Sequence, residues 1–138
     1  MNKPTSIFLP AFILFLASWQ QPVPKEKSGR GKIVYNKVCL SCHMDDGMGV
    51  PRMNPALAKS KLVAGSKTKL IRIVLRGSEE LLNDPNRNYK NLMASHADLT
   101  DQQISDVLTF VRNSFGNKSS IITPGDVKYV RSKTIIKP

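Results

Sequence analysis

The sequence has few cysteines, few histidines and no strand-like segment. Its two cysteines are Cys39 and Cys42, and its two histidines are His43 and His96. A small exported domain stapled by disulfides needs more cysteines than this. No segment alternates apolar and polar residues as a half-buried strand does, and no internal repeat or low-complexity tract is present. The 138 residues are enough for one small domain with extensions, and the expected fold class is all-α.

A long apolar run is also lacking. The longest, residues 7–19, holds thirteen residues, which is short for a membrane span but typical of a signal-peptide core. Lys3 precedes the run, and the small residues Ala17 and Ser18 lie near its end without forming a clear cleavage motif. We predict that residues 1–20 are a signal peptide and that the protein is periplasmic or secreted. An uncleaved anchor and a buried segment are the alternatives.

Acidic residues are scarce. Lys and Arg number 21 against 10 Asp and Glu, which gives a formal net charge of +11. Such a surface attracts anionic partners. Charge alone leaves nucleic acid, an anionic membrane and an acidic protein all open.

Helix signals begin after a polar, proline-rich segment, residues 21–30, which we interpret as a flexible lead. Apolar residues at helical spacing predict a short helix over residues 31–42. Gly and Pro residues make residues 45–65 irregular. Ser66 then caps an apolar helix that Gly77 ends, and residues 77–93 are predicted to be loop.

The strongest local pattern lies near the C-terminus. Thr100 and Gln103 form a capping box, and the apolar residues that follow predict a helix that ends at Gly116. Thr123 followed by Pro124 is typical of the start of a last short helix. These helices together bury too little apolar surface to be secure alone, so something else is expected to fill the core.

The chemistry lies in the sequence Cys39-Leu40-Ser41-Cys42-His43, which has the C-x-x-C-H pattern of covalent haem attachment. Two intervening residues place both thiols on one helical turn, where each can add to a vinyl group of the same haem. His43 then supplies an imidazole to the iron. A local disulfide, a thioredoxin-like pair and a zinc site are the alternatives. The adjacent histidine favours haem, because a thioredoxin-like pair needs strands and zinc needs a second ligand pair.

Around this motif, from about residue 31 to 131, the chain resembles class I cytochromes c, and especially small bacterial cytochrome c domains. The resemblance implies three to five short helices around one covalent haem c, with residues 132–138 as a basic tail. It also implies that Gly31 and Tyr35 of the first helix meet the helix of Val107 and Phe110. The matching segments are Gly31-x-x-x-Tyr35-x-x-x-Cys39, Asp46-Gly47-x-Gly49-Val50-Pro51, Pro55-Ala56-Leu57, Met93, Leu99-Thr100-Asp101-x-x-Ile104-x-x-Val107-Leu108-x-Phe110-Val111-Arg112 and Phe115-Gly116-Asn117.

The resemblance further implies Met93 as the second iron ligand, opposite His43. It implies that the Pro55 carbonyl accepts the His43 ring N–H and that Leu57 packs on the haem. A thioether stabilises Fe(II) and leaves no open position at the iron, which suits a carrier. His96 is the alternative ligand and Met53 a weaker one. The family usually has proline after the methionine, whereas here Ala94 follows.

The expected function is electron transfer by a monohaem cytochrome c, free or as the cytochrome subunit of a dehydrogenase or oxidase chain. A haem enzyme or gas sensor with a labile sixth ligand is the alternative. Redox proteins with an acidic docking face are the expected partners; neither nucleic acid nor a small-molecule substrate is expected, and peripheral membrane association stays open. The candidate docking cations are Lys59, Lys61, Lys67 and Lys69.

Overall fold

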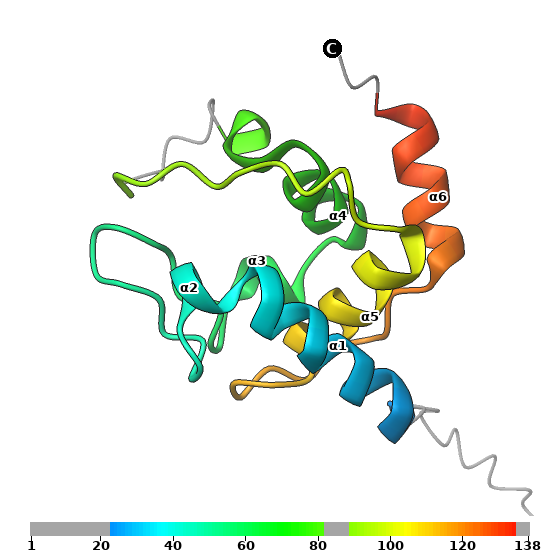
Figure 1. Ribbon diagram of the computed structural model, residues 1–138, viewed down its shortest axis with the longest axis horizontal. Coiled ribbons are helices and arrows are strands. Elements are labelled where there is room, and N and C mark those ends of the chain that lie inside the picture. Colours follow the sequence, from blue (N-terminus) through cyan, green and yellow to red (C-terminus); the bar gives the residue numbers. More distant parts are fainter. Residues whose placement is uncertain (1–22, 82–88, 135–138) are drawn as a thin grey trace, which may run out of the picture.

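A computed structural model describes residues 23–81 and 89–134. Within these ranges the chain forms six α-helices and one 3-10 helix, with no strand beyond an isolated bridge between Val50 and Asn54 (Figure 1). The all-α prediction is confirmed, and the helix number exceeds three to five because two helices are single turns. The elements are α1 (Lys25–Val38), α2 (Leu40–His43), α3 (Lys61–Ala64), α4 (Lys67–Arg76), η1 (Gly77–Leu81), α5 (Asp101–Arg112) and α6 (Pro124–Lys133).

The first helix begins at Lys25, so the prediction of a flexible lead over residues 21–30 is wrong from residue 25 onward. Lys27 Nζ donates to Ser105 Oγ at 2.8 Å and to the Ile122 carbonyl at 2.7 Å. Arg30 Nε donates to the buried Asp106 carboxylate at 2.8 Å. These contacts with α5 and with the segment before α6 outweigh the weak helix propensity of residues 25–30. The predicted signal peptide, residues 1–20, lies outside the described residues.

Helix α1 lies across α5 and makes the most extensive helix–helix contact of the described chain (Figure 1). The crossing is close at Gly31, where a side chain would collide with the Asp106 carbonyl and the Phe110 Cβ atom. One helical turn further along, the buried Tyr35 ring packs at 5.5 Å from the Phe110 ring and 5.3 Å from the Phe115 ring, centroid to centroid. The predicted contact between these two helices is confirmed.

Helix α4 has the predicted ends. The Ser66 side chain accepts a hydrogen bond from the Lys69 amide at the N-terminus, and Gly77 ends the helix with φ of 61°. The following residues form η1, so the segment predicted as loop starts as a 3-10 turn. Residues 82–88 are outside the described residues.

The capping box at Thr100 and Gln103 is present, but α5 ends at Arg112 and not at Gly116. Asn113 caps it, because its side-chain amide donates to the Thr109 carbonyl at 3.0 Å. Helix α6 starts at Pro124 behind the predicted Thr123 cap and runs to Lys133. The first two residues of the predicted basic tail are therefore helical, and residues 135–138 lie outside the described residues.

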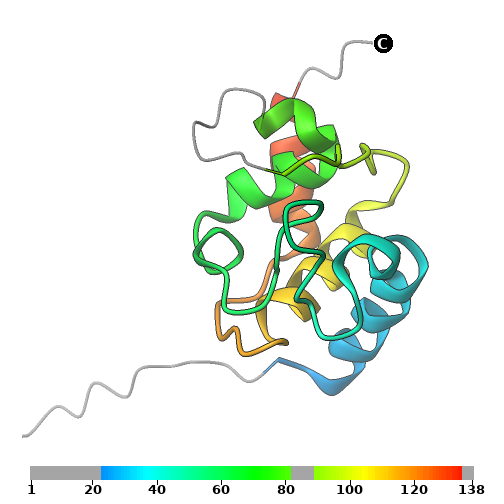
Figure 2. The same ribbon diagram turned by 90° about the vertical axis from the view of Figure 1, so that its left-hand side faces the viewer.

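Helices α4 and α5 supply most of the apolar core, and α6 packs against both of them (Figure 2). Their buried side chains include Leu70, Ile71, Leu75, Ile104, Leu108 and Val111. No helix in residues 23–81 or 89–134 has the length and apolar character needed to cross a bilayer.

The close crossing at Gly31 leads to a first prediction. Gly31→Ala should destabilise the holoprotein by about 1–3 kcal/mol, because the new methyl group forces α1 away from the α5 backbone. Gly29→Ala in the same helix is the control, since its methyl group would meet nothing within 4 Å and alanine favours helix. Denaturant unfolding of both variants measures the effect. Equal stability of the two variants would contradict the close crossing.

Candidate functional site

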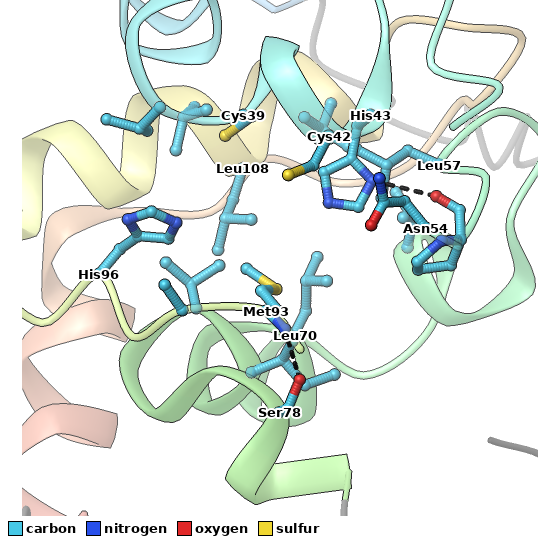
Figure 3. Close-up of a pocket in the computed structure, with 18 of the residues that line it drawn as sticks. Cys39, Cys42, His43, Asn54, Leu57, Leu70, Ser78, Met93, His96 and Leu108 are labelled. Carbon is cyan, nitrogen blue, oxygen red and sulfur yellow. Dashed lines mark hydrogen bonds between the residues drawn. The ribbon is translucent and has the colours of Figure 1, made fainter. Parts of the chain in front are cut away.

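A cavity of about 350 Å³ lies between α4, α5 and the segments that follow α1 and precede α5 (Figure 3). Apolar side chains of α4 and α5 form much of its wall, including Leu70, Ile73, Val74, Val107, Leu108 and Val111. The six residues that the sequence singled out all line this one cavity: Cys39, Cys42, His43, Pro55, Leu57 and Met93.

The two cysteines enter the cavity from the junction of α1 and α2. The His43 amide donates to the Cys39 carbonyl at 3.0 Å, which folds residues 39–43 into one turn. Both sulfur atoms therefore lie along the same edge of the cavity, as Figure 3 shows. They are not joined in a disulfide, and Cys39 is half-buried whereas Cys42 is exposed. Burial raises the pKa of Cys39 to about 11.

His43 is buried, and its ring points into the cavity. Its Nδ1 atom lies 3.0 Å from the Pro55 carbonyl oxygen. A carbonyl can only accept, so Nδ1 carries the proton and Nε2 keeps its lone pair. Burial lowers the pKa of His43, although the Pro55 contact opposes this, so the neutral imidazole is favoured. A neutral ring with a fixed tautomer is the form that binds a metal.

A second hydrogen bond holds the backbone just beyond His43. The buried Tyr35 hydroxyl donates to the Met44 carbonyl at 2.6 Å. Met44 has a positive φ of 62° and ends α2. Tyr35 does not line the cavity, in agreement with the expectation that it packs between helices.

Met93 comes from the opposite side, in the segment that runs past the end of α4 (Figure 3). The other methionines of the described residues, Met44, Met48 and Met53, do not line the cavity. His96 does line it, to one side of the space between His43 and Met93. A group bound by His43 in this cavity could therefore be contacted by the Met93 thioether and by the His96 imidazole.

Several cavity residues were missed by sequence reasoning. Ser78 is buried there and contacts the Met93 backbone, while Asn91 donates to the Asn54 side chain at 3.0 Å across the two loops. Leu62 and Leu92 line the cavity and remain partly exposed at its rim. Isolated serines and asparagines carry no periodic signal, so only the tertiary fold brings them together. The only sequence signal near Ser78 was Gly77, which marks the end of α4.

Comparison with known proteins agrees with the geometry. The family model for cytochrome c matches residues 28–115. The cytochrome c subunit of a quinone-dependent alcohol dehydrogenase from Gluconacetobacter polyoxogenes is 34% identical over 73% of this chain and 22% of its own length. The cytochrome c subunit of gluconate 2-dehydrogenase from Pantoea cypripedii is 31% identical, over 81% of this chain and 26% of its own. Cytochrome c-552 from Thermus thermophilus is 28% identical, over 70% of this chain and 81% of its own.

The chain belongs to the cytochrome c family. Membership of this family implies covalently bound haem c as the cofactor, and homology to cytochrome c subunits of dehydrogenases is consistent with electron transfer. The residues fit that cofactor, because one apolar cavity holds two thiols, a neutral imidazole and a thioether. The chain spans about a quarter or less of the length of the dehydrogenase subunits that it matches.

The Tyr35 contact leads to a second prediction, on pH dependence. Burial raises the pKa of Tyr35 from 10.0 to about 12, so folding favours the neutral phenol. Its contribution is complete below pH 10 and disappears as the pH rises toward 12. Tyr35→Phe should cost about 1 kcal/mol at neutral pH through the lost hydrogen bond. The stability advantage of the wild type over Tyr35→Phe should then shrink above pH 10.

Denaturant unfolding at neutral pH and at several values above pH 10 measures this difference. Tyr129→Phe is the control, because Tyr129 is 64% exposed. A wild-type advantage that stays constant across the alkaline range would contradict the buried neutral phenol.

Proposed function

We propose that this protein is an exported, His/Met-ligated monohaem electron carrier. Cys39 and Cys42 form the two thioether bonds, and His43 and Met93 are the axial ligands. The observation that supports this best is the shared cavity, in which His43 and Met93 come from opposite sides and both cysteines lie along one edge. When bound, the haem supplies the one-electron couple of its iron.

The proximal side would be held by local contacts. His43 follows Cys42 directly, so covalent attachment also presents the imidazole to the iron. The Pro55 carbonyl would keep the ring in one tautomer and make Nε2 a better donor. Leu57 lies in the same wall, with its amide bonded to the Gly47 carbonyl at 2.7 Å, and would pack against the porphyrin.

Met93 as the distal ligand favours a carrier over a haem enzyme or gas sensor. A thioether fills the sixth position, so no substrate reaches the iron, and it favours Fe(II) relative to a second imidazole. Met93 is the only methionine of the described residues that lines the cavity, which supports it over Met53. His96 also lines the cavity and is the rival ligand. Ala94 stands where the family usually has proline, and this substitution is the one feature that favours a labile sixth ligand.

The remaining assignments follow from the sequence. Residues 1–20 would direct export to the periplasm or cell exterior. The sequence predicted the cytochrome domain over residues 31–131; we infer that the domain covers residues 25–133, because α1 begins at Lys25 and α6 ends at Lys133. The dehydrogenase cytochrome subunits among its relatives support a redox protein as partner, with this chain as a free carrier or as a subunit. Peripheral association with a membrane would be compatible with the positive charge.

The docking face would surround the cavity mouth. Lys61 is exposed and adjoins Leu62, which lines the cavity; Lys90 is exposed between two lining residues. Arg52 lies beside Lys90, whose amide donates to the Arg52 carbonyl at 3.0 Å. Lys67 instead pairs with Asp126 of α6, and the stem of Lys59 lies along Gly116. Lys61, Arg52 and Lys90 are therefore the cations best placed to face an acidic partner.

A third prediction tests the distal ligand. The ferric holoprotein should show the weak far-red absorption of a thioether–iron bond, and Met93→Ala should abolish it, lower the reduction potential and open the iron to carbon monoxide in the ferrous state. Met53→Ala is the control, since Met53 does not line the cavity. A Met93→Ala spectrum identical to the wild type would refute the assignment, and His96→Ala would then be the variant that changes the spectrum.

A fourth prediction tests the docking face. Screening acts over about 10 Å at 0.1 M salt, so the second-order rate with an acidic redox partner should fall steeply as salt is added. At low salt, Lys61→Glu should slow that reaction several-fold, while Lys128→Glu on α6, which makes the same charge change away from the cavity, should have a smaller effect. Stopped-flow kinetics against salt measure both variants, with a small neutral mediator as reference. A partner rate that is independent of salt would show that the positive surface serves solvation only.

A further inference from the structure

The end of α4 and the segment of Met93 form an interlocked pair. Four hydrogen bonds join residues 74–78 to residues 93–96, although the bonded residues are 15 to 22 positions apart in the chain. A close backbone approach at Gly77 adds a fifth contact. Together they determine where the Met93 side chain enters the cavity.

Gly77 makes the close approach possible. Its φ of 61° lies in the left-handed region that favours glycine. A Cβ atom on Gly77 would collide with the Met93 carbonyl oxygen and lie 2.7 Å from the Ala94 carbonyl carbon. Any side chain here would push the methionine segment away from the helix end.

Ser78 then holds the Met93 backbone at both of its polar atoms. The Ser78 amide donates to the Met93 carbonyl at 2.9 Å, and the Met93 amide donates to Ser78 Oγ at 2.5 Å. Ser78 is 8% exposed and lines the same cavity as Met93, so little water competes for these bonds (Figure 3). One serine thus satisfies both backbone groups of Met93.

The next residues complete the junction by capping α4. Ser95 Oγ donates to the Leu75 carbonyl at 2.6 Å, and the His96 amide donates to the Val74 carbonyl at 2.9 Å. These carbonyls belong to the last turn of α4, where a helix has no partners of its own for them. The methionine segment is therefore the C-terminal cap of α4, and α4 in turn is its support.

We propose that Ser78 is the positioning residue of the distal ligand and that it holds the Met93 backbone in the conformation that binds iron. The inference rests on the proposed function, in which Met93 is that ligand. With Ala94 after Met93, no proline ring restricts the backbone at that position. The two Ser78 hydrogen bonds supply the restriction instead, and they raise the fraction of molecules whose methionine is ready to bind.

The test is competition for the sixth position in the ferric holoprotein. Added imidazole displaces Met93, so its apparent affinity reports how firmly the methionine is held. Ser78→Ala removes the acceptor for the Met93 amide and should raise imidazole affinity on the order of tenfold. Met93 amide hydrogen exchange should accelerate by a similar factor, and Ser78→Thr, which keeps the hydroxyl, should restore both values toward wild type.

Ser132→Ala is the control, because Ser132 Oγ also forms a hydrogen bond with the backbone, donating to the Tyr129 carbonyl, but at an exposed position of α6. Unchanged imidazole affinity in Ser78→Ala, or an equal rise in Ser132→Ala, would overturn the proposal. If Ser78→Ala does not fold, the wild-type protein decides: a rapidly exchanging Met93 amide overturns the proposal and a protected one supports it. A wild type without the far-red band would instead overturn the proposed Met93 ligation, and this inference with it.

Discussion

The crossing of α1 over α5 is the constraint on which the site depends. Because Cys39 follows directly after α1, the position of that helix determines where both thiols and His43 enter the cavity. The crossing is close at Gly31, and it is held at its N-terminal side by Lys27 and Arg30, which converge on Asp106. A buried carboxylate without such partners would be costly, so the two cations and Asp106 stabilise the crossing only as a set.

A second buried charge holds the other side of α5. Arg112 is 2% exposed, and its guanidinium donates to the carbonyls of Val63, Gly65 and Ser120. Burial lowers its pKa, but arginine remains charged in the physiological range. The segment from α3 to α4 is thereby attached to the C-terminal end of α5, and the apolar wall of the cavity is built between them. The helices alone leave this cavity open, so haem completes the core as well as the redox site, and its binding contributes to folding stability.

Local chemistry made much of this fold predictable. The caps at Ser66, Thr100 and Thr123 are present, because capping depends on residues three apart in sequence. The start of α1 was not predictable, since it depends on Lys27 reaching residues nearly 80 positions away. The same holds for Ser78, whose partner Met93 is distant in sequence. The C-x-x-C-H motif predicted the arrangement around His43, whereas both Met93 and His96 line the cavity and an absorption spectrum is what distinguishes them as ligands.

The two sides of the cavity are built differently, and this has a consequence for stability. The proximal side is local: residues 39–43 form one turn, and the Pro55 carbonyl is twelve residues from His43. The segment of residues 93–96 is held by long-range hydrogen bonds to the end of α4, and its residues Ala94 and Ser95 are exposed. Segments with few buried contacts and exposed backbone open first. With Met93 as the proposed sixth ligand and the haem bound covalently on the His43 side, opening of the segment around Met93 would release the methionine without releasing the cofactor. The strength of the contacts between Ser78 and Met93 would then determine whether the iron stays six-coordinate or gains an accessible sixth position.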